Sequence, residues 1–179
     1  MVFVFFTGLH LNFKPMFINV FNHSITDNIQ KNGVYKFPAF DHYIADKVFT
    51  NTGPGAFASQ SWLDDAVVRE HPLNQRLCDC FRLMFLDEKH APNAYLLRSI
   101  EADRALKLYY YARPQEMAAR AFEACIQDAP IKNAFLVQGT KKTTEARLGI
   151  YPRDTLRNKL NDALMVYFYQ LGIALTSKS

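Results

Sequence analysis

Four polar side chains in residues 113–129 (RPQEMAARAFEACIQDA) have the types and spacing to do chemistry. At about 100° per residue on a helix, Glu116, Arg120, Glu123 and Gln127 fall within one narrow stripe. The remaining surface of that helix is almost wholly apolar, so most of it should be buried. Since a buried carboxylate must be paired, protonated or bound to a cation, the stripe is either a ladder of ion pairs or an edge that faces a ligand.

Both interpretations of this stripe stay open from the residues alone. Glu116 and Arg120 lie four residues apart, so they could form a solvated ion pair that Glu123 completes. For an average helix we favour this interpretation. In the other one, a glutamate points into a site that another helix builds.

The elements that position this stripe are predicted to be helices. Pro114 suits a first helical turn, and Ala, Met, Glu, Gln and Arg fill most of the stretch that follows. Apolar periodicity predicts further helices at residues 37–49, 61–68 (capped by Ser61), 72–88, 93–112 and 153–175. In the helix over 93–112, the side chains expected to face the core are Leu96, Leu97, Ile100, Leu106 and Leu108.

Other segments predict little regular structure. Residues 2–6, 17–21 and 134–137 could form short strands, and 139–149 is expected to be a loop. A composition shift near Gly33 separates an N-terminal segment of uncertain origin, 1–33, from a helical domain over 34–179. We therefore expect a mainly α fold of about six helices, with at most one or two short N-terminal strands and a poorly integrated N-terminal segment.

Composition excludes several classes of protein. The 179 residues are 49% hydrophobic, with 15 Phe and 9 Tyr, which suits one domain with a substantial core. Three cysteines make no disulfide framework and indicate a reducing cytoplasm. The apolar opening stretch is interrupted by His10, Asn12, Lys14 and Pro15, so we expect neither a spanning helix nor a membrane partner.

The basic residues are unevenly distributed. The net charge of +4 is too small to indicate nucleic acid by itself, but residues 132–159 hold seven basic residues against two acidic ones. Lys141, Lys142 and Arg147 are the candidates there for binding nucleic acid or an acidic protein. We favour the simpler account, a solvated loop and helix face.

Two segments resemble a known group of domains. Residues 39–44 (AFDHYI) and 110–124 (YYARPQEMAARAFEA) are similar to zinc-metallopeptidase-like domains of the CLCA-X family and to the related large polyvalent-protein-associated domains. These domains occur in bacteria, often in large proteins of mobile elements. The second segment resembles their later helix, aromatic-x-x-Pro-x-Glu-Met-x-Ala-Arg-Ala-Phe-Glu, and is the more specific match. The resemblance runs from about Phe37 to near the C-terminus and implies a zincin-like fold.

The resemblance also implies a chemistry. In such domains two histidines of a His-Glu-x-x-His helix bind zinc, the glutamate activates the metal-bound water, and a carboxylate from a later helix closes the site. Glu116 or Glu123 would be that later carboxylate, and we prefer Glu116. His42, one turn beyond the position of the motif, is the third vestigial metal candidate.

The sequence departs from this pattern within the motif. Counting back from residue 39, the histidines would stand at Val34 and Pro38 and the general base at Tyr35, and none of these residues can do the work. We therefore expect a non-catalytic remnant of zincin-like type, without a resident cofactor, in which residues 1 to about 38 replace the N-terminal half by truncation, frameshift or insertion. Its exposed apolar surface would suit a protein partner.

Two rival functions remain. One is an interaction module that uses the basic region over 132–159. The other is a metal-dependent hydrolase with a non-standard site built from His42, Asp41 and Glu116.

Overall fold

The computed structural model describes residues 36–129 and 139–177, with the side chains of 36–39 outside that description. The described part is mainly α, as predicted, and its isolated bridges, Phe49 with Val68 and Leu86 with Pro92, form no sheet. The possible strands at 2–6, 17–21 and 134–137 lie outside the described residues, as does the N-terminal segment. Seven helices are seen in the described ranges: α2 (Lys36–Val48), α3 (Ala58–Leu63), α4 (Pro72–Phe85), α5 (Ala94–Leu106), α6 (Pro114–Asp128), α7 (Thr144–Leu148) and α8 (Asp154–Thr176).

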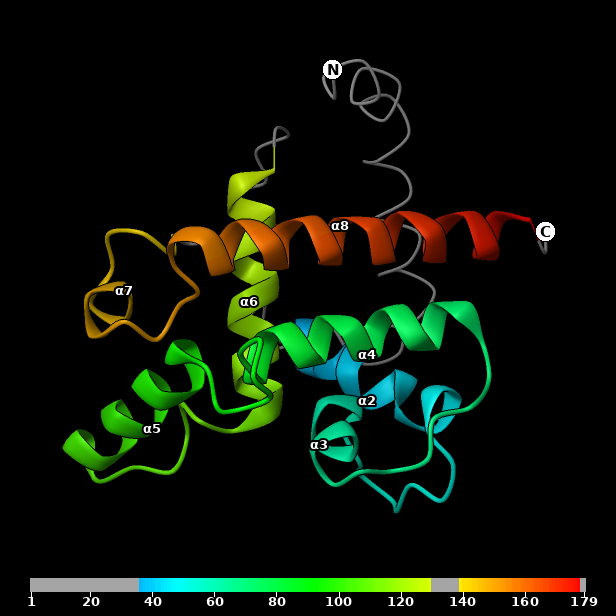
Figure 1. Ribbon diagram of the computed structural model, residues 1–179, viewed down its shortest axis with the longest axis horizontal. Coiled ribbons are helices and arrows are strands. Elements are labelled where there is room, and N and C mark those ends of the chain that lie inside the picture. Colours follow the sequence, from blue (N-terminus) through cyan, green and yellow to red (C-terminus); the bar gives the residue numbers. More distant parts are fainter. Residues whose placement is uncertain (1–35, 130–138, 178–179) are drawn as a thin grey trace.

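The long helix α8 and the central helix α6 organise the fold. Helices α4 and α8 lie alongside one another, and α6 crosses them (Figure 1). Helix α2 packs on α6 and on α3 at one end of the molecule, while α5 and α7 lie at the other end. None of the described helices combines the length and the apolarity that crossing a bilayer requires.

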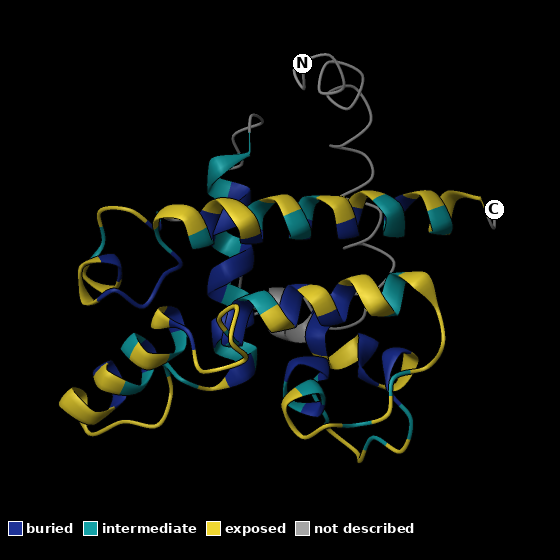
Figure 2. Cartoon of the chain, in the orientation of Figure 1, coloured by how far each residue is buried: buried dark blue, intermediate teal, exposed yellow. Residues whose placement is uncertain are grey.

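Aromatic rings fill the core where these helices meet. The ring of Phe168 in α8 lies 5.4 Å from that of Phe40 in α2 and 5.3 Å from that of Phe122 in α6. Phe81 and Phe85 of α4 are fully buried in the same cluster. Figure 2 shows the buried positions concentrated on α6 and on the facing sides of α4 and α8. The core therefore joins elements far apart in the sequence.

Helix α6 has almost the bounds that its sequence predicts. Pro114 occupies the first turn, and the helix ends at Asp128. Met117, Ala118, Ala121 and Ala124 have no exposed surface. Because three of these are alanines, neighbouring backbones can approach α6 closely. The polar stripe of the helix is thereby brought near the loops around it.

Two predicted helices differ from the structure at their ends. The short helix was expected to start at Ser61, but α3 starts at Ala58, and Ser61 lies inside it with its hydroxyl donating to the carbonyl of Phe57. Helix α5 ends at Leu106, so the tyrosines at 109–111 follow the helix rather than belong to it. Leu97, Leu106 and Leu108, expected to face the core, are about half exposed.

The predicted loop at 139–149 contains helix α7. The hydroxyl of Thr143 accepts a hydrogen bond from the amide of Ala146, which caps the first turn. Gly149 ends the helix with a φ of 82°, a left-handed conformation that glycine adopts without strain. Both signals are readable in the sequence, so this short helix could have been predicted.

The three cysteines are free and buried, in agreement with the sequence. Burial raises the pKa of the Cys78 thiol to about 11 and those of Cys80 and Cys125 to about 12. They are therefore inert core residues near neutral pH.

Candidate functional site

Arg120 is the buried centre of the polar stripe on α6. Only 7% of its surface is exposed, and its Nε donates a 2.8 Å hydrogen bond to the carbonyl of Ile150. Its Nη2 donates to the carbonyl of Tyr111, whose ring also lies beside the guanidinium. The guanidinium thus joins two loops that are far apart in sequence. The solvated Glu116–Arg120 ion pair that we favoured is wrong, because Arg120 turns inward to these carbonyls.

Each glutamate of the stripe acts on a tyrosine hydroxyl. The hydroxyl of Tyr151 donates to Glu123 Oε2 over 2.7 Å, and, after burial, Glu116 is the carboxylate that raises the pKa of Tyr110. Burial, followed by these carboxylates, raises the pKa of Tyr110 to about 12 and that of Tyr151 further still. Both phenols therefore keep their protons at neutral pH, and that of Tyr151 acts as a donor.

The fourth member of the stripe holds a third segment. The side-chain oxygen of Gln127 accepts hydrogen bonds from the amide of Thr140, over 2.8 Å, and from its hydroxyl. The side chains of α6 thus bind residue 111 and residues 150–151 and, nearer the end of the helix, residue 140. The polar side chains of the stripe therefore bind the loops that surround α6.

Asp103 positions the first of these loops. This carboxylate is buried at the end of α5 and accepts hydrogen bonds from the amides of Tyr111 at 2.8 Å, Ala112 at 3.0 Å and Tyr110 at 3.2 Å. Those bonds turn the chain away from the helix. They also direct the Tyr111 carbonyl toward Arg120.

A second buried arginine fixes the N-terminal half of α8. Arg157 Nε donates to Asp128 Oδ2 over 2.5 Å, and its Nη2 donates to the hydroxyl of Thr140 over 2.8 Å and to the carbonyl of Ala124 over 3.2 Å. Burial alone would raise the pKa of Asp128, but hydrogen bonds from Arg157 and Lys141 outweigh it and lower that pKa to about 2. Arg157 belongs to the basic region over 132–159, for which we favoured a solvated loop and helix face, and it is instead buried.

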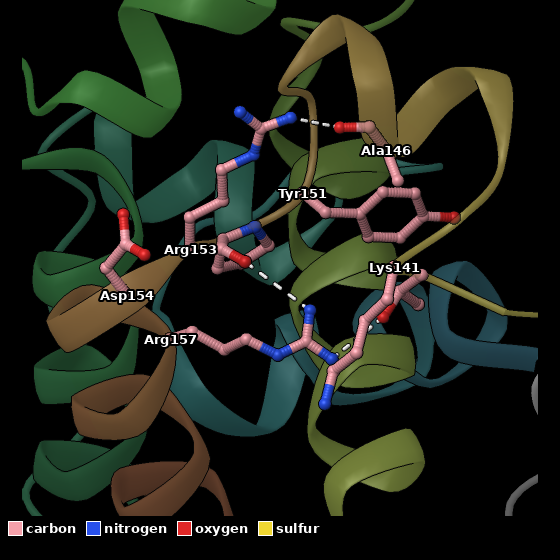
Figure 3. Close-up of a pocket in the computed structure, with 8 residues that line it drawn as sticks. Lys141, Ala146, Tyr151, Arg153, Asp154 and Arg157 are labelled. Carbon is pink, nitrogen blue, oxygen red and sulfur yellow. Dashed lines mark hydrogen bonds between the residues drawn. The ribbon is translucent and has the colours of Figure 1, made fainter.

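An open pocket of about 240 Å³ adjoins this end of the stripe. Figure 3 shows Arg157 reaching toward Lys141, while Arg153 points to the carbonyl of Ala146 and the carboxylate of Asp154 points aside. Arg157 Nη1 also donates to the carbonyl of Pro152 over 3.4 Å. The lining residues are Thr140, Lys141, Ala146, Tyr151, Pro152, Arg153, Asp154 and Arg157. The pocket is therefore cationic, but its cations already contact protein acceptors.

The three basic residues proposed to bind a partner have different surroundings. Lys141 lies 2.6 Å from Asp128 Oδ1 in an ion pair, although much of its side chain is exposed. Lys142 and Arg147 are exposed. Arg147 belongs to α7 and Lys142 to the turn before it, so these two cations border the pocket without lining it.

The metal candidates have separate surroundings. His42 is exposed on α2, and its Nδ1 lies 2.8 Å from the carbonyl oxygen of Ala56. Asp41 is fully buried and accepts hydrogen bonds from the amide and hydroxyl of Ser59, at 2.9 and 2.5 Å. Burial, only partly offset by these bonds, raises the pKa of Asp41 to about 6. Over residues 36–129 and 139–177, no three His, Cys, Asp or Glu side chains come close enough to hold a metal ion.

Sequence reasoning missed several of the residues that complete this site. Asp103, Asp128 and Tyr151 each contact residues at least seven positions away in sequence, so periodicity gives no sign of them. Arg157 has a better signal, because it lies one turn before the buried Leu160 on α8. An arginine on the apolar face of a helix predicts a buried carboxylate or carbonyl partner.

Comparison with known proteins supplies one match. The family model of the large polyvalent protein-associated domain 1 matches residues 102–175. That range runs from the end of α5 through α8, and so holds the polar stripe, its loops and the pocket. Neither the curated proteins nor the solved structures gave a significant match.

Proposed function

We propose that this protein is a non-catalytic domain of zinc-metallopeptidase-like ancestry, of bacterial or mobile-element origin, in which the α6 stripe has a structural role. The observation that carries the proposal is the engagement of the stripe by the fold itself: Tyr151 donates to Glu123, and the guanidinium of Arg120 binds loop carbonyls. The match of residues 102–175 supports the resemblance to large polyvalent protein-associated domains, and the zinc-metallopeptidase-like ancestry rests on the sequence pattern of residues 34–44 and 110–124.

The sequence before α6 supports the loss of catalysis. Zinc hydrolysis of this type needs two imidazoles and a general-base carboxylate, whereas Val34, Tyr35 and Pro38 occupy the corresponding positions. If Glu123 turned to ligate a metal, it would also give up its bond from the buried Tyr151 hydroxyl, at a cost of about 1 to 3 kcal/mol. Without the other zinc ligands, α6 therefore stabilises the fold more by holding its loops than by ligating a metal.

Elemental analysis of the purified full chain tests the proposal. After equilibration with zinc and desalting, we expect less than about 0.1 zinc per chain. The matched variants are Glu116→Gln, which removes the candidate ligand, and Glu70→Gln, which changes an exposed glutamate before α4. A content near one zinc per chain that only Glu116→Gln abolishes would overturn the proposal.

A second candidate function is binding of an acidic protein beside α7. The observation that favours it is the exposure of Lys142 and Arg147 at the border of a pocket lined by Lys141 and Arg153. Such binding should weaken as salt rises, because exposed charges are screened within about 8 Å at physiological ionic strength. Lys142→Gln with Arg147→Gln should reduce affinity for a polyglutamate probe several-fold, while the exposed pair Lys89→Gln and Arg104→Gln should not.

DNA fragments serve as the comparison ligand in the same titration. Tighter binding to DNA than to polyglutamate would assign the basic region to nucleic acid instead. Binding that neither salt nor the Lys142 and Arg147 changes affect would remove this second function altogether.

A further inference from the structure

The pocket at the start of α8 is surrounded by more positive than negative charge. Lys141, Arg153 and Arg157 line it, against one acidic lining residue, Asp154. Figure 3 shows the carboxylate of Asp154 pointing aside. Nearby, Lys141 and Arg157 share a single carboxylate, because both of them pair with Asp128. The side chains at the pocket therefore leave positive charge without a counter-charge from the protein.

Arg153 is the lining cation that has no carboxylate partner in the described part of the chain. It takes part in none of the ion pairs there, and its Nη2 donates instead to the carbonyl of Ala146 and, over 3.5 Å, to that of Arg147. A guanidinium carries five N–H donors, and those on Nε and Nη1 of Arg153 have no acceptor among residues 36–129 and 139–177. These donors stay available to a ligand.

A second arginine adds to this positive charge. The Cδ atom of Arg98 in α5 lies 2.9 Å from the point where a Cβ on Gly149 would stand, and the guanidinium carbon of Arg153 lies 3.6 Å from the same point. Both side chains therefore lie against Gly149. The Nε atom of Arg98 is buried and has no hydrogen-bond partner. Two like-charged side chains at one residue, without a described carboxylate for either, favour an anion, because it offsets the repulsion between them.

The first turn of α8 supplies backbone donors to the same pocket. Pro152, Arg153 and Asp154 line the pocket at the point where the helix begins. Arg153 is the N-cap residue and makes no side-chain cap hydrogen bond, so the amides of this turn lack a capping side chain. Amides at the start of a helix favour negative charge. They add donors to a pocket that its cations define.

The volume of the pocket indicates a small ligand. At about 240 Å³ it lies below the range of about 300 to 1,000 Å³ that is usual for drug-sized ligands. A phosphate group is small, carries up to two negative charges and has acceptor oxygens that point in several directions. It can therefore accept hydrogen bonds from Lys141, from Arg153 and from the amides of α8 at once. A carboxylate has one charge and two oxygens in a single plane.

We propose that this pocket binds a phosphate group, as inorganic phosphate or as part of a small phosphate monoester, through Lys141, Arg153 and the first amides of α8. Arg157 keeps its protein acceptors and shapes the pocket, since it donates to the hydroxyl of Thr140 and to the carbonyl of Pro152. Because the pocket is open, the remainder of a monoester extends into solvent.

This proposal goes beyond both proposed functions. It uses none of the glutamates of the stripe, so it does not depend on the loss of catalysis. It also does not use Lys142 or Arg147, on which binding of an acidic protein rests, because these two cations border the pocket without lining it. The three ideas can therefore fail separately.

An NMR titration of the ¹⁵N-labelled full chain tests the proposal. Inorganic phosphate is added while sodium chloride keeps the ionic strength constant, and we expect the amides of residues 154–156 to shift and to saturate with a Kd of about 1 mM. Acetate should bind at least about tenfold more weakly, because it has less charge and fewer oxygens. Phenyl phosphate separates the two sources: tighter binding than that of inorganic phosphate identifies a monoester site, and weaker binding identifies a site for the free ion.

Variants assign the binding to the pocket. Arg153→Gln should weaken phosphate binding at least about tenfold, because it removes the charge and its available donors. Lys141→Gln should weaken it several-fold, and this second change leaves the bond between Arg153 and Ala146 in place. The matched control is Lys142→Gln with Arg147→Gln, which also removes positive charge but should change the affinity less than about twofold. Circular dichroism checks that each variant keeps its helices.

Three results would overturn the proposal. The first is a phosphate titration in which residues 154–156 show no saturable shift up to about 50 mM. The second is equal affinity for phosphate and acetate, since the pocket would then bind any small anion. The third is binding that Arg153→Gln leaves unchanged and that Lys142→Gln with Arg147→Gln abolishes, which would place the anion on the border of the pocket instead.

Discussion

Replacement of Arg120 by methionine probes the most heavily used side chain of the stripe. Methionine has a similar length and fills the space, but it donates no hydrogen bond, so the carbonyls of Ile150 and Tyr111 lose their donors. Each buried carbonyl left unpaired costs about 1 to 3 kcal/mol. Removing a buried guanidinium also removes its desolvation cost, which favours the lower part of the combined range, so we expect a loss of about 2 to 4 kcal/mol.

Urea unfolding followed by far-UV circular dichroism measures this loss. Arg104→Met on the exposed side of α5 is the matched control and should change the free energy of unfolding by less than about 0.5 kcal/mol. Hydrogen exchange gives a local readout, since amides at 110–112 and 149–151 should exchange faster in Arg120→Met under native conditions. If Arg120→Met and Arg104→Met have equal stability and equal exchange, Arg120 does not hold the two loops.

Two further changes test individual contacts. Tyr151→Phe removes only the hydroxyl that donates to Glu123, and it should cost about 1 to 2 kcal/mol in urea unfolding, against almost nothing for the exposed Tyr169→Phe; a neutral Tyr151→Phe would show that this bond is not formed. Burial raises the pKa of Asp41 to about 6, so the native state binds the carboxyl proton of Asp41 more tightly than the unfolded state does. The stability that this proton contributes is therefore complete below about pH 4 and is lost as the pH rises through 6. Asp41→Asn can keep both hydrogen bonds to Ser59, and it should remove up to about 3 kcal/mol of the fall in unfolding free energy between pH 4 and 6.5. If the unfolding free energy of Asp41→Asn falls with pH as steeply as that of the native protein, the fall belongs to other groups.

The sequence predicted the parts of the fold that local chemistry decides. Pro114 and the alanine-rich stretch after it predicted α6, and apolar periodicity predicted α2, α4 and α8 to within a few residues. The mainly α fold follows from these elements. Asn93 caps α5, because its side-chain oxygen accepts hydrogen bonds from the amides of Tyr95 and Leu96. An asparagine directly before an apolar helical run is a sequence signal for such a cap.

The errors arose where a distant side chain competes with local preference. Periodicity would continue α5 through residue 112, but Asp103 binds the amides of Tyr111 and Ala112 and ends the helix early. The start of α3 is decided by Asp41, eighteen residues earlier, which binds Ser59. In the stripe, the spacing of Glu116 and Arg120 favoured an ion pair, whereas two carbonyls outside α6 took the guanidinium. These partners depend on the tertiary fold, which spacing along one helix does not contain.

Thermal unfolding of the full chain with and without zinc tests the central claim, that the α6 stripe holds loops rather than a metal. A site with a Kd of about 1 μM would, at about 100 μM zinc, stabilise the native state by about 2.7 kcal/mol, which corresponds to about 5 to 10 °C for a chain of this size. We predict a Tm unchanged within about 1 °C. A rise of 5 °C or more that Glu116→Gln or Glu123→Gln abolishes would contradict the claim.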